Sequence, residues 1–478
     1  MERILTSKQM RSADEYTINT LKVPSEVLVE RAGGAVADEI ISRFKGGRVL
    51  VIVGKGNNGE DGKVIAKRLS LVHGFSVSVL NASNGILKLF DKKYDIIVDC
   101  IFGTGLSRNV DGKYKEIIDK INNYGAFVVS CDIPSGINGD TGEVMGAAVK
   151  ANLTIAIGEY KLGHFLGDGI DYSGKVILKD IGISVWGDDF VYRLNDKDIK
   201  KCFPNRNRNS HKGKYGKAVV IGGSRDFTGS IVLSQNSLCA LKMGAGYSFV
   251  GAPKSLFSSL VGKNPECILS LLSDRDGNLV FDKNDLEKFL NADAISFGMG
   301  VGVSEEIYKI IKYLLVEYKG VLILDADALN TISKYGVDIL REKNCKLILT
   351  PHIGEFCRLN NAKKDTIMSD IIEEVKDFAY KYDLICVMKS AVSIISDGKQ
   401  VFVNTTGNSA LAKAGSGDVL TGIMAGLNAR VDDTLLATLT ACYIFGKSAE
   451  IATKNSNEYF VTASDVIGSI GKAIDSIM

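Results

Sequence analysis

The stretch RVLVIVGKGNNGEDG, residues 48–62, decides the fold class of this chain. It contains VLVIV, an uninterrupted apolar run of the kind found in a strand that is buried on both faces of a parallel sheet. A glycine cluster follows the run, and the spacing of the apolar residues after it predicts an amphipathic helix that ends near residue 69. A strand that passes through a glycine-rich turn into a helix predicts a doubly wound α/β sheet.

Outward from this stretch, strand and helix patterns alternate along the chain. Two helices are expected before it, at 7–21 and 25–44, and further buried strands after it, at 76–80, 95–99, 126–132, 153–158 and 175–183. The segment NRNRNSHKGKYGK lacks apolar periodicity and is typical of a linker or surface loop. A second α/β series begins with KAVVIGG, so the sequence predicts two domains, residues 1–205 and 206–478.

Composition excludes several classes of protein. Of the 478 residues, 45% are hydrophobic and 24% charged, and the formal net charge of +2 gives no reason to expect binding to nucleic acid or to a membrane surface. Nine cysteines without a C-x-x-C pair, together with four histidines, predict neither a disulfide scaffold nor a zinc site. The N-terminus lacks the apolar core of a signal peptide, and the longest apolar stretch, 435–445, is too short to cross a bilayer. We therefore expect a soluble, cytoplasmic protein without nucleic-acid or membrane partners.

Polar residues follow three of the expected strands, at the edge of the sheet where ligands bind in open α/β folds. Asn58, Asp99 and Ser135 offer hard oxygen atoms that suit a cation. Asp132 is placed to serve as a general base. The three segments are therefore expected to converge on one crevice.

The glycine loop itself has a simpler interpretation. Its glycines match G-x-G-x-x-G, but Asn81 stands at the end of the next strand, where the dinucleotide fingerprint requires an acid. Asn and Asp tolerate left-handed backbone and bond to their own chain, so a turn with a helix cap also explains the polar residues of this loop.

Four motifs favour a functional role for this loop over a purely structural turn. VPSEVLVERAG, GKGNNGEDG, VDCIFGTGL and DIPSGINGDTG resemble, in the same order, the N-terminal domain of the bifunctional NAD(P)H-hydrate repair enzymes. The resemblance covers about the first 190 residues. It implies a Rossmann-like domain that epimerises the R and S forms of hydrated NAD(P)H at C6 of the nicotinamide ring.

The resemblance also implies the residues of this first site. Potassium would be held by Asn58, Asp99 and Ser135, and Glu60 departs from the family, in which glycine is usual. The residues implied to contact the substrate are Asn57, Asn58, Gly59, Glu60, Asp61, Gly103, Thr104, Gly105, Leu106, Ser107, Arg108, Asn109, Tyr114 and Asp132.

The second half carries a different signal, NTTGNSALAKAGSGDVLTG at 404–422. AGSGD places small residues and free backbone N–H groups at the start of an expected helix, 418–427, where phosphate charge is stabilised. Asp418 is placed to take a proton from a hydroxyl as a phosphoryl group transfers. A glycine-rich helix start with an acidic cap would explain Asp418 as well, but not the scarcity of side chains on both flanks.

This segment resembles the ribokinase-like fold, and more closely its NAD(P)H-hydrate dehydratase branch. The supporting motifs are HKGKYGKAVVIGGS, ALKMGAGYSFVGAP, SFGMGVG, LDADALN and TPHIGEF, with departures at Ile353, where proline is common, and at Ser390 and Ala391, where glycine is common. The resemblance implies contact with the hydrated nicotinamide by Ala240, Gly302, His352 and Asp418. It implies ADP binding by Lys389, Ser390, Ala391, Val392, Ser393, Asn408, Ala414, Gly415, Ser416 and Gly417. A histidine at a strand end is otherwise often a buried, structural hydrogen-bonding residue.

Together the two resemblances imply an α/β enzyme that epimerises NADHX and NADPHX and dehydrates the S form at the expense of ADP, releasing AMP and phosphate. The C6 hydroxyl would be phosphorylated, with Asp418 as the base and Mg²⁺ on the phosphates, and phosphate would then be eliminated. We also expect a homo-oligomer. The alternatives are a ribokinase-like small-molecule kinase with a regulatory N-terminal domain, and a first domain that only binds nucleotide or RNA. The choice between ADP and ATP, and between NADHX and NADPHX, stays open.

Overall fold

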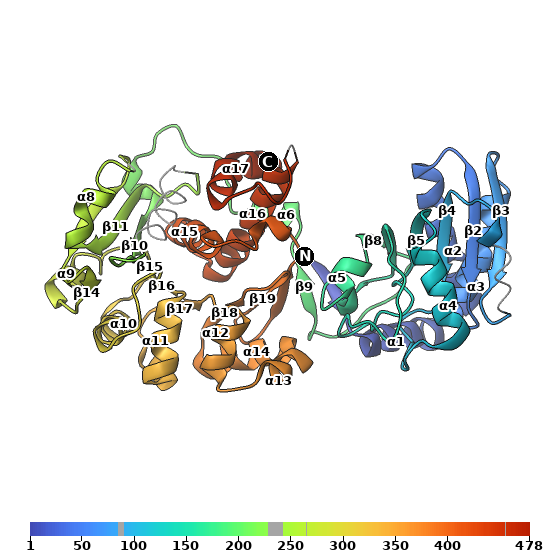
Figure 1. Cartoon of the computed structure of the whole chain (residues 1–478), viewed down its shortest axis with the longest axis horizontal. Coiled ribbons are helices and arrows are strands. Elements are labelled where there is room, and N and C mark those ends of the chain that lie inside the picture. The colour runs from blue at the N-terminus through green and yellow to red at the C-terminus, as the bar shows by residue number, and fades with distance from the viewer. Residues whose placement is uncertain (85–89, 228–241, 264, 455) are drawn as a thin grey trace. The chain divides into compact units, whose positions relative to one another are not determined.

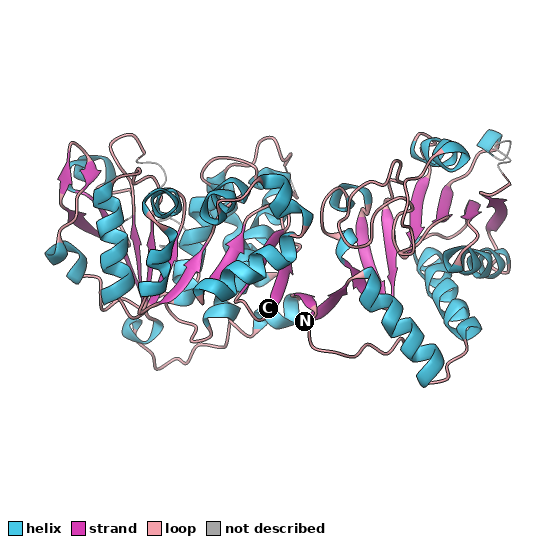
Figure 2. Ribbon diagram, turned by 90° about the horizontal axis from the view of Figure 1, so that it is seen from below, coloured by secondary structure: helices cyan, strands magenta, loops and turns pink. Residues whose placement is uncertain are grey.

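The computed structural model describes residues 1–84, 90–227, 242–263, 265–454 and 456–478 (Figure 1). The chain divides into two compact units. The first consists of Arg3–Val191, and the second of Met1–Glu2 together with Tyr192–Met478. Each unit has its own sheet with helices on both faces (Figure 2).

The first unit is built on a six-stranded sheet in which every neighbouring pair is parallel. The order is β3 (Phe75–Asn81), β2 (Gly47–Val53), β4 (Ile96–Cys100), β5 (Phe127–Cys131), β6 (Leu153–Ile157) and β8 (Lys175–Lys179). These strands confirm the strand positions expected from the sequence. Strands β2, β4, β5 and β6 are largely buried, whereas β3 and β8, also expected as buried, are mostly half-buried or exposed because they form the two edges of the sheet. A short strand, β1 (Glu2–Leu5), pairs in parallel with β7 (Tyr160–Lys161).

Alternate residues of β2 explain why both faces of this sheet are covered. Val49, Val51 and Val53 pack with α2 (Ser25–Arg43) and α3 (Asn57–Ser70). Leu50 and Ile52 point to the other face and pack with α4 (Gly112–Asn122). The expected helix at 7–21 is α1 (Ser7–Glu15) followed by a π-helical turn, Tyr16–Thr20. The doubly wound fold expected for this half is therefore observed.

From β12 to β20, the longer sheet of the second unit is parallel except for two antiparallel pairs at β18–β19 and β19–β20. Its order is β12 (Ile268–Leu272), β11 (Tyr247–Pro253), β10 (Lys217–Ile221), β15 (Ala294–Phe297), β16 (Val321–Leu324), β17 (Lys346–Leu349), β18 (Ile385–Met388), β19 (Ser393–Ser396) and β20 (Val401–Asn404).

Two layers of helices cover this second sheet (Figures 1 and 2). On one face, α15 (Ser416–Asn428), α16 (Thr434–Thr453) and α17 (Ala463–Asp475) share one apolar core with the strands. The other face carries α10 (Glu305–Glu317), α11 (Asp327–Tyr335), α12 (Ile353–Asn360), α13 (Lys364–Ser369) and α14 (Ile371–Tyr382). Of the described helices, α16 alone is long and apolar enough to span a membrane, and most of it is buried in this core.

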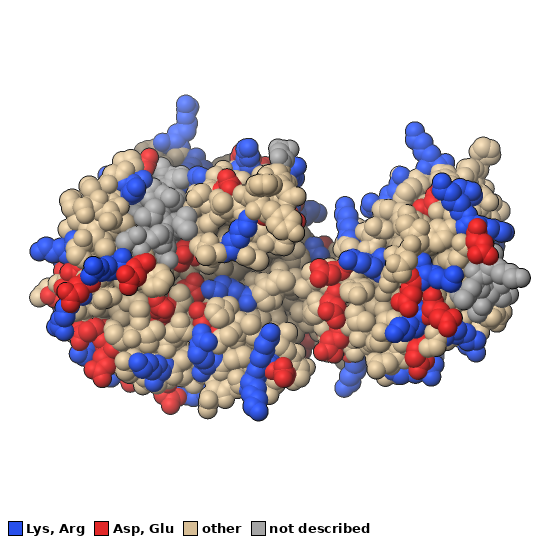
Figure 3. Space-filling model, viewed as in Figure 1, with Lys and Arg blue, Asp and Glu red and all other residues tan. Residues whose placement is uncertain are grey.

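The surface agrees with the near-neutral charge. Figure 3 shows basic and acidic side chains interspersed over the visible face of both units. The described residues on this face therefore form no large basic patch of the kind that binds nucleic acid.

Close backbone approach fixes α3 against the sheet. A Cβ at Gly62 would lie 2.7 Å from Val53 Cγ1 and 2.8 Å from Cys100 Cβ, and both neighbours are buried. On the opposite side of the helix, a Cβ at Gly33 of α2 would lie 2.7 Å from the Asp61 carbonyl oxygen. Helix α3 is therefore wedged between the sheet and α2, and only glycine fits at these positions.

This packing predicts opposite effects for one substitution at two helical glycines. Gly62→Ala should destabilise the first unit by about 1–3 kcal/mol, since the new methyl group overlaps fixed core atoms. Gly468→Ala in α17, where no atom of the described residues lies within 4 Å of the added Cβ, should stabilise the second unit by about 0.5–1 kcal/mol through helix propensity. Denaturant unfolding followed by circular dichroism checks both. Equal stability of the Gly62→Ala variant and the parent would contradict the wedge.

Candidate functional site

A cavity of about 880 Å³ opens in the first unit at the carboxyl ends of β2, β4 and β5. Its walls come from α1, α2, the start of α3 and the loop 101–108. Twelve of the residues expected to contact substrate line it: Asn57, Asn58, Glu60, Asp61, Gly103, Thr104, Gly105, Leu106, Ser107, Arg108, Tyr114 and Asp132. Gly59 is packed against the Gly54 carbonyl, and Asn109 is exposed beyond the lining.

A buried carboxylate holds the strand ends together. Asp99 is fully buried, and its two oxygens accept hydrogen bonds from Ser130 Oγ (2.9 Å), the Ser135 amide (2.9 Å), Ser135 Oγ (2.5 Å) and the Ile101 amide (3.2 Å). Burial raises the pKa of the Asp99 carboxyl, and these hydrogen bonds oppose the rise. The end of β4 is thereby tied to the loop that follows β5.

Asn58 lies beside this network with one atom unsatisfied. Its Nδ2 donates to the carbonyls of Phe102 (2.8 Å) and Cys131 (3.2 Å), and Ser135 Oγ contacts the same Phe102 carbonyl at 3.2 Å. Asn58 Oδ1 is buried, and no described residue donates a hydrogen bond to it. A buried orphan acceptor next to a carboxylate and a hydroxyl is a donor set that fits a monovalent cation. The residues present therefore fit potassium.

Asp132 stands in the left-handed region with φ 67°, a conformation that costs free energy in a non-glycine residue and clusters at functional sites. The buried ammonium of Lys161 donates to Asp132 Oδ1 and, at 2.7 Å, to the Ile157 carbonyl. His164 Nδ1 accepts the Lys161 amide (3.1 Å), so its Nε2 carries the proton and donates to the Asp132 carbonyl (2.8 Å). Lys161 and His164 were not expected from the sequence.

Two further carboxyls face the same cavity. Burial raises the pKa of Asp61 to about 8, and the negative charges of Asp132 and Asp14 add to the rise. Burial likewise raises the pKa of Asp14 to about 6, where Lys161 opposes the shift. The cavity therefore brings together carboxyls whose protonation differs near neutral pH.

The second unit holds a site at the start of α15. Gly415 adopts φ 87° and precedes the helix, and Asp418 lies half-buried in its first turn. A Cβ at Gly417 would lie 3.6 Å from Asp325 Oδ2 and 3.6 Å from Lys389 Nζ. The glycine-rich loop, with Ala414 and Ser416, therefore adjoins a charged pair.

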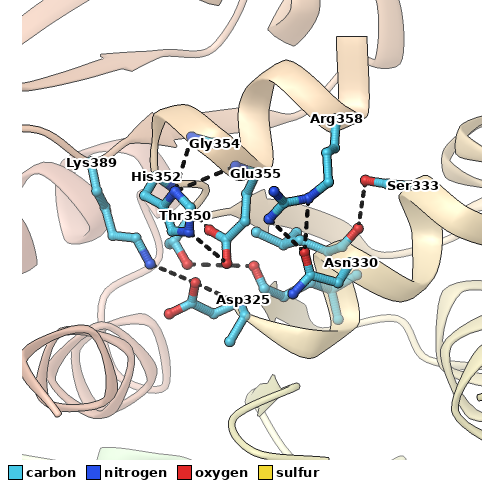
Figure 4. Close-up of polar contacts among 12 residues, drawn as sticks. Asp325, Asn330, Ser333, Thr350, His352, Gly354, Glu355, Arg358 and Lys389 are labelled. Atoms are coloured by element: carbon cyan, nitrogen blue, oxygen red, sulfur yellow. Dashed lines mark hydrogen bonds and ion pairs between the residues drawn. The ribbon is translucent and has the colours of Figure 1, made fainter. Parts of the chain in front are cut away.

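That charged pair organises the strand ends of the second sheet (Figure 4). Lys389 Nζ lies 2.6 Å from Asp325 Oδ1, which also accepts the Ala326 amide at 2.8 Å. Glu355 accepts the His352 amide at 2.8 Å, and burial raises the pKa of Glu355 to about 7. Asp325 and Glu355 lie in motifs quoted from the sequence, but neither was expected in the site. Carboxylate oxygens are the ligands that magnesium prefers, but no cluster of three or more His, Cys, Asp or Glu side chains placed to hold a metal ion occurs among the described residues.

His352 differs from the buried histidine considered from the sequence. Its side chain is 53% exposed and caps α12, where Nδ1 accepts the amides of Gly354 (3.0 Å) and Glu355 (3.4 Å). Desolvation, with Lys389 and Arg358 nearby, lowers the pKa of His352. The cap fixes the ring beside Glu355.

The remaining expected residues are spread over three places. Gly302 has φ 75°, no described atom lies within 4 Å of where its Cβ would stand, and its amide donates to Asp327 Oδ2 (2.9 Å). The turn into β19 consists of Ser390, Ala391, Val392 and Ser393, the last of which begins the strand. In this turn Ser390 Oγ donates to the Val392 carbonyl. Asn408 caps a short 3₁₀ turn and donates to Thr453 Oγ1. Ala240 lies outside the described residues.

Comparison with known proteins bears on both units. Residues 218–471 match the family model for NAD(P)H-hydrate dehydratase, and residues 25–89 and 80–163 match that for the YjeF-related protein N-terminus. The bifunctional NAD(P)H-hydrate repair enzyme Nnr of Dictyoglomus turgidum is 32% identical over 100% of this chain and 99% of its own length.

Two solved structures cover the second unit. The ADP/ATP-dependent NAD(P)H-hydrate dehydratase from Bacillus subtilis, co-crystallised with ATP/Mg²⁺, is 26% identical with a TM-score of 0.52, covering 60% of this chain and 99% of that one. A ribokinase-like superfamily protein from Enterococcus faecalis, 23% identical, covers 60% of this chain and 96% of its own with the same TM-score, which confirms the ribokinase-like fold. The chain, matched end to end by its relative and in each half by a family model, belongs to the bifunctional NAD(P)H-hydrate repair enzymes.

Proposed function

We propose that this chain repairs NADHX and NADPHX, the hydrates of NADH and NADPH. It interconverts their R and S epimers at C6 of the nicotinamide ring and dehydrates the S epimer at the expense of ADP, releasing AMP and phosphate. One observation carries the proposal: the chain has two sites at strand ends, and the chemistry of the two sites differs. The chain also matches a bifunctional relative over its full length.

The two activities are assigned to the two halves, with the epimerase in residues 1–205 and the dehydratase in residues 206–478. The cavity lined by Asp132 supports the first assignment. The glycine-rich start of α15 supports the second. Residues 192–205, which include α6 (Asp196–Lys200), belong to the compact unit of the second half.

In the epimerase, the substrate lies in the cavity against the Asn57–Asp61 turn, the loop from Gly103 to Asn109, and Tyr114. Asp132 is the general base, and the ion pair with buried Lys161 orients its carboxylate. Asn58, Asp99 and Ser135 would hold potassium, which supplies a fixed positive charge at the crevice when bound.

In the dehydratase, the problem is that hydroxide leaves poorly and phosphate leaves well. Asp418 takes the proton of the C6 hydroxyl as that oxygen attacks the terminal phosphorus of the nucleotide. The backbone N–H groups of residues 415–417 stabilise charge on the transferring group. Loss of the C5 proton then expels phosphate and restores the ring double bond. Gly302, His352 and Ala240 contact the hydrated nicotinamide in this proposal.

The nucleotide lies on the turn from Lys389 to Ser393, on Asn408, and on the loop from Ala414 to Gly417. Asp325 and Glu355 are the carboxylates that would hold Mg²⁺ on the phosphates, where the ion neutralises developing charge. The Bacillus subtilis relative, crystallised with ATP/Mg²⁺, supports the use of nucleotide and magnesium. We further propose that ADP is the nucleotide used, which activity measurements with ADP and with ATP would test. We also propose a homo-oligomer, tested by light scattering, and a cytoplasmic location, tested by cell fractionation.

Asp418→Asn is expected to lower the dehydration rate of the S epimer with ADP about a hundred- to ten-thousandfold, because the base is lost. Recovery of dihydronicotinamide absorbance and release of phosphate measure this rate in the parent and the variant. A stable phosphorylated product from the parent would instead indicate a kinase. Asp338→Asn, an exposed carboxylate in the same unit, is the matched control and should retain the parent rate. Dehydration by Asp418→Asn within a few-fold of the parent would contradict the assignment.

Asp132→Asn is expected to abolish epimerisation and leave dehydration of the S epimer intact. Asparagine is chosen because it tolerates the left-handed backbone at this position, whereas alanine would be strained there. With mixed epimers and ADP, the progress curve should stall once the S fraction is consumed. Complete consumption faster than spontaneous epimerisation would show that Asp132 is not the base.

A further inference from the structure

Four of the ionisable side chains that line the cavity of the first unit come from four different elements and interact electrostatically with one another. Asp14 comes from α1, Asp61 from α3, Asp132 from the loop after β5, and Lys161 from β7. The ammonium of Lys161 donates hydrogen bonds to Asp132 and to the Ile157 carbonyl. Asp132 is therefore oriented by a buried ion pair.

Asp61 is held differently. No described residue donates a hydrogen bond to its carboxyl or forms an ion pair with it, although the side chain faces the cavity. Its backbone is closely packed on two sides, because Gly62 lies against Val53 and Cys100, and the Asp61 carbonyl oxygen lies against Gly33. A carboxyl on a closely packed backbone, in a cavity and without a partner among the described residues, is placed to meet a polar group of the ligand.

We propose that Asp61 is the proton donor of the epimerisation and that Asp132, positioned by Lys161, is the proton acceptor. This inference rests on the proposed function, because it assumes that a hydrate with a hydroxyl at C6 occupies the cavity. Lys161 is a positioning residue in this scheme, since it acts through Asp132.

The chemistry follows from the bond to be remade. C6 carries the hydroxyl and is bonded to ring N1, so the lone pair of N1 can form a C6–N1 double bond as the C6–O bond breaks. The departing oxygen keeps the bonding pair and takes the proton of Asp61, leaving as water. Water then attacks C6 from the other face, the double-bond electrons return to N1, and the excess proton passes to Asp132. Asp61 ends ionised and Asp132 protonated, and the reverse reaction uses them in the opposite roles.

The electrostatics of the cavity agree with this division. The pKa of Asp61, about 8, keeps its proton in place at neutral pH. Glu60 of the same helix, Asp14 of α1 and Asp132 raise that pKa through their charges, and Lys161 opposes them. The other charged or titratable side chains that line the cavity are Arg11, Glu26, Glu30, Lys55, Arg108 and Tyr114.

The test uses the full-length protein, the purified R epimer, and chromatographic separation of R from S. Asp61→Asn keeps the size of the side chain and removes the transferable proton. It should lower kcat for R-to-S conversion about a hundred- to ten-thousandfold with little change in KM. Asp38→Asn, a carboxylate exposed on α2 outside the cavity, should behave as the parent.

Each outcome separates this inference from the function on which it rests. If the parent itself does not interconvert the epimers, the proposed function of this unit fails. If the parent does so and Asp61→Asn retains kcat within a few-fold, or raises KM alone, Asp61 is not the donor. For the parent, kcat/KM for the R epimer should fall as pH rises through about 8, because the acid form of Asp61 is lost, and this limb should be absent from the residual activity of the variant.

A second measurement does not depend on substrate. The pKa of Asp61 is about 8 in the folded chain against an ordinary value of 3.8, so between these values unfolding releases a proton. The stability that this carboxyl contributes is complete below about pH 4 and is lost as pH rises toward 8. Denaturant midpoints at pH 5 and pH 8 should therefore differ more for the parent than for Asp61→Asn. Equal pH dependence would show that Asp61 is ionised at neutral pH and would overturn its role as donor.

Discussion

A carboxylate buried at the carboxyl end of a parallel strand must be satisfied by the protein, and this constraint organises both units. Burying an ionised carboxyl costs several kcal/mol, roughly the penalty for buried ions in proteins, unless hydrogen bonds or a counter-charge replace the solvent. Asp99 meets the constraint with hydroxyl and amide donors, and Asp325 meets it with Lys389. Each solution draws a neighbouring loop onto the strand end, and those loops form the sites.

The two solutions lead to different chemistry. The hydroxyl donors of Ser130 and Ser135 bring no counter-charge to Asp99, and together with the unsatisfied Asn58 oxygen they leave a place for a cation. The Lys389 ammonium pairs with Asp325 directly beneath the glycine-rich loop, so that positive charge lies 3.6 Å from where a Gly417 Cβ would stand. The first arrangement suits a cation beside the cavity, and the second suits a nucleotide phosphate at a helix start.

The sequence predicts the strands and the site residues that lie in local motifs. It does not predict the site residues that only the folded chain brings together. The strand at 49–53 is an apolar run, and Asn58, Asp99, Asp132 and Ser135 follow strands within motifs, so they were predicted. Lys161 lies in a two-residue strand, and a lone lysine is ordinarily expected at the surface, although this one is 1% exposed. Its burial depends on Asp132, 29 residues away, and no periodicity carries that information. Asp14 lies on a short amphipathic helix whose polar face would ordinarily be solvated.

Glu60 departs from the family pattern, fits the helix without strain and affects the pKa of a neighbouring carboxyl. Glycine is usual at this position, yet the residue has ordinary helical backbone in the first turn of α3, so the side chain imposes no strain. Negative charge is favourable at a helix N-terminus, and Lys63 one turn later pairs with Glu60 at 2.6 Å. The charge is not fully cancelled, because it still contributes to the raised pKa of neighbouring Asp61. A substitution on the rim of the cavity thus acts on the protonation of a carboxyl inside it, and the backbone of the loop need not move.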